Sequence, residues 1–192
     1  MFNVVAVGIG AAMVIGSSLA QNNSLSDMAK QVSAKGCNGV LGAVTVEFVQ
    51  VPKGATCTLN GTRVEGNVQV EDNASLFANN ARINGNLQSE NAMRISVREG
   101  SVNGSIQVKQ GASASVIGTK VGSNIQFDEM RGWLSLSNNI VSGNIQIAKN
   151  LGRISVVKNR ISGNLQCKEN SLSPTGGGNI VQGNKEDQCL RL

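Results

Sequence analysis

Apolar and polar residues alternate with a period of two along most of this chain of 192 residues. That period indicates β-strands with one buried face, because an amphipathic helix repeats every 3.6 residues. The alternation surrounds a recurring Gly-Asn-aliphatic-Gln sequence, whose glutamines are spaced 19, 19, 19, 20 and 20 residues apart. The six copies are Gly66–Gln69, Gly85–Gln88, Gly104–Gln107, Ser123–Gln126, Gly143–Gln146 and Gly163–Gln166, followed by a degenerate copy at Gly183–Glu186. The sequence therefore predicts a tandem repeat built of strands.

Aligned on this repeat, the aliphatic residues fall into columns with one member per copy. One column is Val64, Ile83, Val102, Val121, Val141, Ile161 and Val181. A repeat of this length cannot bury its own apolar face, but stacking the repeats about 4.8 Å apart pairs each strand with its equivalents. We predict an all-β fold, a single-stranded, right-handed parallel β-helix (β-solenoid) of about seven coils. The alternative is an antiparallel sandwich or barrel, which does not require like residues to recur in register.

The first twenty residues differ from the repeats. Residues 4–20 are uncharged and apolar or small, and the chain becomes polar at Gln21. Ser18-Leu19-Ala20 supplies the small residues that precede a signal-peptidase cut, although no Lys or Arg stands before the apolar run. We predict a signal peptide at residues 1–20, with an uncleaved membrane anchor as the alternative.

The rest of the chain divides into an N-terminal segment and cap at 21–56, the parallel β-helix at 57–189 and a tail at 190–192. After cleavage of the signal no membrane span remains. The expected location is therefore outside the cytoplasm, in the periplasm, at the cell surface or in the extracellular space.

Four cysteines stand behind the predicted signal, so we expect disulfides. Cys57 and Cys167 lie several coils apart, roughly 25 to 30 Å, whereas the Cα atoms of a disulfide lie within about 7 Å. Cys37 and Cys57 are separated by about one coil, as are Cys167 and Cys189. We predict these two pairs, each joining a terminal coil to its neighbour. Thiols divided between two distant ends cannot share one metal ion, so we predict no metal site.

Composition narrows the chemistry further. The chain has no histidine, which excludes Ser-His-Asp and Cys-His mechanisms. Its formal charge is +5, but the basic residues are scattered and aromatic residues amount to 3%, which argues against a nucleic-acid partner. The best acidic cluster is Glu71-Asp72, Glu90 and Asp128-Glu129, interrupted by Lys109, and solvated turn charges explain it better than catalysis or calcium binding. We predict no catalytic residue and no cofactor.

Two polar columns flank the inward aliphatic residue of the repeat. Amides stacked in register hydrogen-bond along the axis, and this structural role needs no ligand. The alternative is a polar strip that binds a polysaccharide or a second solenoid, with Trp133 stacking on a sugar. The simpler role for Trp133 is a cation–aromatic contact with Arg153, one coil later. The ligand or assembly face thus predicted is Asn67, Gln69, Asn86, Gln88, Gln107, Asn124, Gln126, Trp133, Asn144, Gln146, Asn164 and Gln166.

These motifs resemble a group of exported bacterial β-helix repeat proteins of unknown function. The resemblance rests on Cys57-Thr-Leu-Asn-Gly61, on the Gly-Asn-aliphatic cores, and on the run from Gly163-Asn-Leu-Gln-Cys167 to Gly183-Asn-Lys-Glu-Asp-Gln-Cys189. More distantly, the repeats resemble bactofilins, which are polymer-forming cytoskeletal β-helices of bacteria. An export signal and four cysteines depart from a cytoplasmic bactofilin. The resemblance implies a fold and a compartment, and no ligand.

Together these observations predict a non-catalytic, exported structural or surface-associated β-helix that acts as a rigid spacer or self-associating element. A carbohydrate-binding module that uses the exposed Asn and Gln columns is the alternative. A polysaccharide lyase or hydrolase is the third hypothesis. The expected partners are a second copy of the chain or an extracellular polysaccharide.

Overall fold

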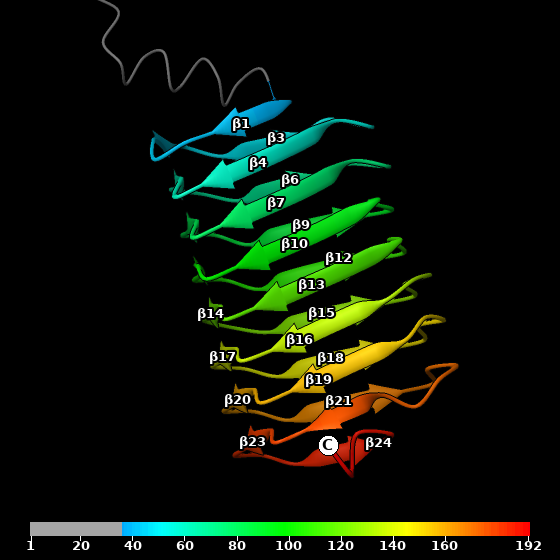
Figure 1. Cartoon of the computed structure of the whole chain (residues 1–192). Helices are drawn as coiled ribbons and strands as arrows, with labels where there is room; N and C mark the ends of the chain where they lie inside the picture. Colours follow the sequence, from blue (N-terminus) through cyan, green and yellow to red (C-terminus); the bar gives the residue numbers. More distant parts are fainter. Residues whose placement is uncertain (1–35) are drawn as a thin grey trace, which may run out of the picture.

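Residues 36–192 form a β-solenoid of about eight coils in the computed structural model of the chain. Each coil contributes one strand to each of three eight-stranded sheets, and every strand pair is parallel (Figure 1). Figure 1 shows the strands of one sheet in front, pointing to the left, while successive coils descend from the N-terminal end, so the solenoid is right-handed. The predicted fold is confirmed, and the antiparallel alternative is wrong.

The three sheets differ in strand length. Sheet A consists of β1 (Gly39–Leu41), β4 (Thr56–Asn60), β7 (Ser75–Asn79), β10 (Arg94–Arg98), β13 (Ser113–Ile117), β16 (Leu134–Ser137), β19 (Ile154–Val157) and β22 (Thr175–Gly177). Sheet B consists of the two-residue strands β2 (Thr45–Val46), β5 (Arg63–Val64), β8 (Arg82–Ile83), β11 (Ser101–Val102), β14 (Lys120–Val121), β17 (Ile140–Val141), β20 (Arg160–Ile161) and β23 (Ile180–Val181). Sheet C consists of β3 (Val49–Val51), β6 (Val68–Val70), β9 (Leu87–Glu90), β12 (Ile106–Lys109), β15 (Ile125–Asp128), β18 (Ile145–Ala148), β21 (Leu165–Lys168) and β24 (Lys185–Asp187). Sheets A and C are therefore the broad faces, and sheet B is a narrow edge.

The core is a stack of aliphatic columns, as the repeat predicts. In sheet C, Ile106 pairs in register with Leu87 and Ile125, and all three side chains are buried. In sheet A, Ile95 and Ala114 stack in the same way. Each fully buried aliphatic side chain stabilises the fold by about 1.5–3 kcal/mol. The inward columns therefore supply most of the favourable energy of stacking.

The solenoid begins one coil before the first recognisable repeat. Residues 39–51, within the segment that we assigned to an N-terminal cap, already form β1, β2 and β3. Val49 and Gln50 pair with Val68 and Gln69, but Glu47-Phe48 stands where the next coil has Gly66-Asn67. The first coil keeps the inward aliphatic residue and loses the Gly-Asn signature. This is why the repeat predicts about seven coils and the structure has about eight.

Close stacking favours the glycine of the repeat, and Ser123, another small residue, takes its place in one copy. A Cβ atom added to Gly85 would lie 2.6 Å from the carbonyl oxygen of Gly66, one coil earlier, and would also overlap the side chain of Asn67. Such a separation is well inside van der Waals contact, so the corner between sheets B and C closes only around a small residue. The glycines of the repeat thus set the spacing of the coils at this corner.

Two columns of buried asparagine run along the axis through the turns of the C-terminal coils. In the turn between sheets A and B, the N–H of Asn139 donates to Oδ1 of Asn159 at 3.1 Å, and the N–H of Asn159 donates to Oδ1 of Asn179 at 2.9 Å. The Nδ2 atom of Asn159 also donates to the carbonyl of Leu136 at 3.0 Å. A buried backbone group without a partner is costly, and each asparagine satisfies two of them.

The second buried column lies in the turn between sheets C and A. Oδ1 of Asn150 accepts from the N–H of Met130 at 2.8 Å, and Oδ1 of Asn170 accepts from the N–H of Asn150 at 3.1 Å. Gln188 continues the column, because its Oε1 accepts from the N–H of Asn170 at 2.9 Å. Sequence analysis missed both columns as structural elements. The asparagines recur every 20 residues in the sequence, but the sequence does not show whether an asparagine in a turn is buried.

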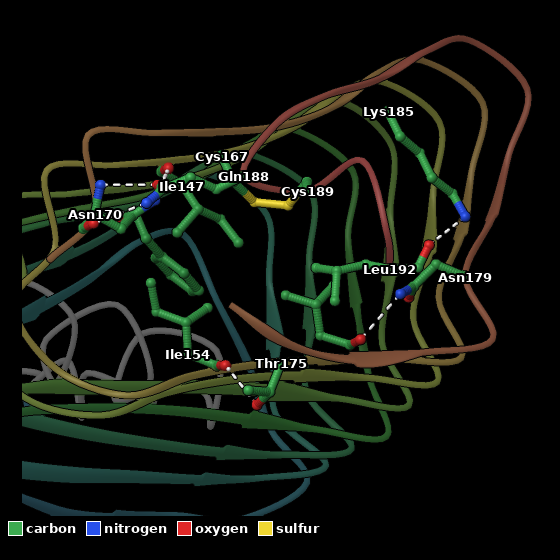
Figure 2. The surroundings of a disulfide bond; sticks show 12 residues. Ile147, Ile154, Cys167, Asn170, Thr175, Asn179, Lys185, Gln188, Cys189 and Leu192 are labelled. Carbon is green, nitrogen blue, oxygen red and sulfur yellow. Dashed lines mark hydrogen bonds between the residues drawn. A yellow bond between two sulfur atoms is a disulfide. The ribbon is translucent and has the colours of Figure 1, made fainter. Parts of the chain in front are cut away.

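Both disulfides confirm the predicted pairing. The Cα atoms of Cys37 and Cys57 are 5.5 Å apart, and those of Cys167 and Cys189 are 5.2 Å apart. At the C-terminal end, Figure 2 shows the second disulfide together with Leu192, which lies inside the outline of the coils. Leu192 is only 6% exposed and belongs to the core cluster, and Nζ of Lys185 donates to its backbone oxygen. The residues predicted as a tail therefore close this end of the solenoid.

The predicted signal peptide at residues 1–20 lies outside the described residues. Within residues 36–192, no helix is long and apolar enough to cross a membrane.

We expect the C-terminal disulfide to stabilise the last coil. The double variant Cys167→Ser/Cys189→Ser opens a loop of 22 residues and should lower the free energy of unfolding by about 3 kcal/mol in urea titrations. Hydrogen exchange should accelerate in β21 and β24 while β10 stays protected. The double variant Cys37→Ser/Cys57→Ser is the matched control and should affect the first coil instead. Unchanged exchange in β24 would contradict this role.

We expect the buried asparagine column to be essential for stability. Asn159→Ala leaves the N–H of Asn139 and the carbonyl of Leu136 without partners, which should cost about 2–5 kcal/mol of unfolding free energy. Asn103→Ser is the control, because it removes an exposed amide contact to Asn84 and should change stability by about 0.5 kcal/mol or less. If urea denaturation showed the same loss of unfolding free energy in both variants, burial of Asn159 would not explain its contribution to stability.

Candidate functional site: the amide-lined face of sheet C

Five of the six glutamines of the repeat, from Gln88 to Gln166, form a continuous ladder on the outer face of sheet C, and Gln69 pairs in register with Gln88. Each Nε2 donates to Oε1 of the glutamine one coil later, at 3.1, 2.9, 2.5 and 2.9 Å for the four steps from Gln88 to Gln166. The last amide, Gln166, donates to the carboxylate of Glu186 at 2.7 Å. An amide nitrogen has two hydrogens and the oxygen has two lone pairs, so each inner glutamine keeps one of each for a ligand.

The asparagines of the repeat have a different task. Oδ1 of Asn67 accepts from the backbone N–H of Asn86 at 2.8 Å, and Oδ1 of Asn144 accepts from the N–H of Asn164 at 2.7 Å. The same bond joins Asn124 to Asn144 at 2.8 Å. These side chains replace the ladder bond that the backbone cannot make at the corner between sheets B and C. Their oxygens are thus committed to the fold.

The structure divides the predicted face between two sides of the molecule. The eleven asparagines and glutamines lie together along sheet C and the corner that leads into it. Trp133 stands immediately before β16, and its carbonyl accepts from the N–H of Ala114 in sheet A at 3.2 Å. Its side chain therefore belongs to the other broad face. The sequence places residues in columns but does not fix which columns share a face of the coil.

Two adjoining hollows follow the glutamine ladder, with volumes of about 410 and 570 Å³. They share Gln107 and Lys109 and together extend from Lys53 to Asp187. A neighbouring outward column carries Glu90, Lys109 and Asp128 in register, so charges of both signs border the amides. This trough could hold an extended polymer or the edge of another solenoid by many weak polar contacts.

The acidic cluster lies at one end of this trough. Glu71, Asp72 and Glu90 line the first hollow together with Lys53 and Lys109. The carboxylate of Glu71 accepts from Nε2 of Gln50 at 2.5 Å and from the backbone N–H of Lys53 at 3.0 Å, which links the first two coils. Among residues 36–192, no three carboxylates or thiols converge on a point where a metal ion would bind.

One ion pair with shifted pKa values lies on the narrow edge, away from this trough. Nε of Arg63 donates to Glu65 at 2.5 Å on sheet B. That hydrogen bond lowers the pKa of the Glu65 carboxyl and, with the charge of the carboxylate, raises the pKa of Arg63. Both groups are solvent-exposed, so water and salt screen the pair, and it does not mark a reactive site.

Comparisons of the chain with family models, with curated proteins and with solved structures gave no match.

Proposed function

We propose that this protein is a non-catalytic structural element that works outside the cytoplasm as a rigid spacer or self-associating rod. The observation that carries this proposal is that the amide side chains of the repeat hydrogen-bond to the neighbouring coil and do not converge on one site. Two disulfides support an oxidising, exported location. In this proposal the protein acts through its rigid shape and through the contacts that its surface makes.

Stiffness follows from the way neighbouring coils are joined. Three parallel sheets and the glutamine ladder connect one coil to the next, and the two buried asparagine columns do so in the C-terminal coils. Bending the rod would lengthen several of these bonds at once. In solenoids each unit contacts only its neighbours, so bonds between coils determine both stability and rigidity.

The two ends of the rod differ, which supports self-association at one of them. At the C-terminal end Leu192 covers the core, and Ile180 and Leu190 are the apolar side chains exposed in the last coil. At the other end β1, β2 and β3 are the terminal strands of their sheets among the described residues, and Val40, Val44 and Phe48 are exposed. Terminal strands with apolar side chains readily pair with further strands.

We expect the exported, disulfide-bonded protein to form oligomers whose mass rises with concentration in size-exclusion chromatography with light scattering. Val40→Lys places a charge at the apolar end and should weaken association about tenfold or more. Leu190→Lys is the matched control, because Leu190 is as exposed as Val40 but lies at the other end. A monomer at every concentration would exclude self-association and leave only the spacer role.

Carbohydrate binding is the second candidate function, and the trough along the glutamine ladder favours it. If the free hydrogens and lone pairs of this ladder bind a glycan, Gln107→Ala/Gln126→Ala should weaken binding on a glycan array about tenfold. Asn103→Ser is the control, because Asn103 is an exposed amide that follows β11 of sheet B. Binding that survives the double change would remove the trough as a glycan site.

A further inference from the structure

The outer face of sheet A carries a further hollow, of about 440 Å³, whose lining includes Phe77, Arg94, Ser113 and Trp133. It lies on the broad face opposite the glutamine ladder (Figure 1). Neither the structural role nor the trough on sheet C uses these residues.

Arg94 and Trp133 stand on either side of a small residue. Arg94 pairs in register with Ser113, and Trp133 directly precedes Leu134, which pairs with Ala114. The arginine and the tryptophan are therefore two coils apart, about 10 Å along the axis, with Ser113 between them. Ser113 is only 6% exposed and forms the floor. The hollow that these residues line, of about 440 Å³, has room for one sugar ring.

The two aromatic residues interrupt the repeat without a packing task. Phe77 occupies an outward column of sheet A that begins with Val40 and in which the other residues are Ser or Thr, namely Thr58, Ser96, Ser115, Ser135, Ser155 and Thr175. Trp133 lies in the turn that lengthens the repeat from 19 to 20 residues, because Asp128 pairs with Lys109 whereas Leu134 pairs with Ala114. The indole is 45% exposed. Since other coils fold with hydroxyls at the position of Phe77, stacking does not require an aromatic ring there.

The charge of this face has one sign. None of the eight strands of sheet A contains Asp or Glu, whereas β10 contains Arg94 and Arg98. Within residues 36–192, the ion pairs are Arg63 with Glu65 and Lys168 with Glu169, so Arg94 is not neutralised. An exposed guanidinium beside aromatic rings favours an anionic ligand with a carboxylate or sulfate group.

We propose that this hollow binds an acidic sugar unit of a polysaccharide, a hexuronate. Trp133 stacks on the C–H face of the ring, Arg94 donates two parallel hydrogen bonds to the carboxylate, and Phe77 closes the opposite side. A nucleic-acid strand fits less well, because it presents a phosphate at every nucleotide and this face has no run of basic residues. The site is independent of the structural role, since a rod can fold and associate with the hollow empty.

The single tryptophan makes binding directly measurable. The chain has one Trp and no Tyr, so the fluorescence of Trp133 reports on this hollow alone. We expect trigalacturonate to change the emission in a saturable way, and maltotriose, which is neutral, to bind at least about tenfold more weakly. An unchanged emission at saturating trigalacturonate, confirmed by calorimetry, would overturn the proposal. Tighter binding of oligo(dT) than of trigalacturonate would overturn it in favour of nucleic acid.

The repeat supplies variants that keep the fold. Arg94→Ser and Phe77→Ser introduce the residue that the next coil carries in register, Ser113 or Ser96. Each should weaken trigalacturonate binding about tenfold. Arg82→Ser is the matched control, because it removes the same charge on sheet B, where Ser101 follows in register. It should change binding less than about twofold.

Two results would separate this site from the functions proposed above. Equal weakening by Arg82→Ser and Arg94→Ser would mean attraction by net charge alone and would overturn the site. Gln107→Ala/Gln126→Ala should leave the fluorescence titration unchanged, and loss of binding in that variant would place the glycan on sheet C instead. Light scattering of Arg94→Ser should match the unchanged protein, since Arg94 in β10 lies three coils from β1, which contains Val40.

Discussion

Hydrogen bonding between parallel strands in exact register is the interaction on which this molecule depends. Each coil offers its N–H and C=O groups to the coil above and the coil below, and neighbouring strands lie about 4.8 Å apart. A shift of register by one residue would turn the inward column of Ile106 and Ile125 outward and move Gln107 and Gln126 into the core. Because the register is fixed, similar residues recur at equivalent positions of successive repeats in the sequence. They fix both what lies inside and what covers the surface.

Because the register is strict, most of the fold could be predicted from the sequence. The spacing of the glutamines gave the coil length, and the coil length gave the partners of Cys37 and Cys189. The aliphatic columns identified the core. Each of these predictions depends only on how many coils separate two residues along the axis. The period of the repeat gives that number directly, so the predictions succeeded. The first coil escaped because Glu47-Phe48 replaces the Gly-Asn pair while the strand pairing continues through Val49.

The candidate site was harder to predict, because it depends on the cross-section of the coil rather than on its axis. Alignment of the repeats places Trp133 and Gln126 in columns, but the angle between those columns around the coil follows from the turns, whose lengths vary. The sequence therefore joined residues that the structure separates onto sheets A and C. It also could not tell Asn139, which is buried, from Asn138, which has a left-handed backbone and is exposed. Both stand in the same turn, and only the path of the chain decides between them.

The glutamine ladder has a direction, and that direction has an electrostatic consequence. Every amide from Gln88 to Gln166 turns its nitrogen toward the C-terminal end, so the small dipoles of these side chains add along the axis, as peptide dipoles do in a helix. The positive pole of the array points at the place where the aliphatic and amide pattern gives way to Lys185-Glu186. Glu186 accepts from both Gln166 and Asn164 there. The degenerate last repeat thus acts as an acidic cap, and the solenoid carries an intrinsic electrostatic polarity along its length.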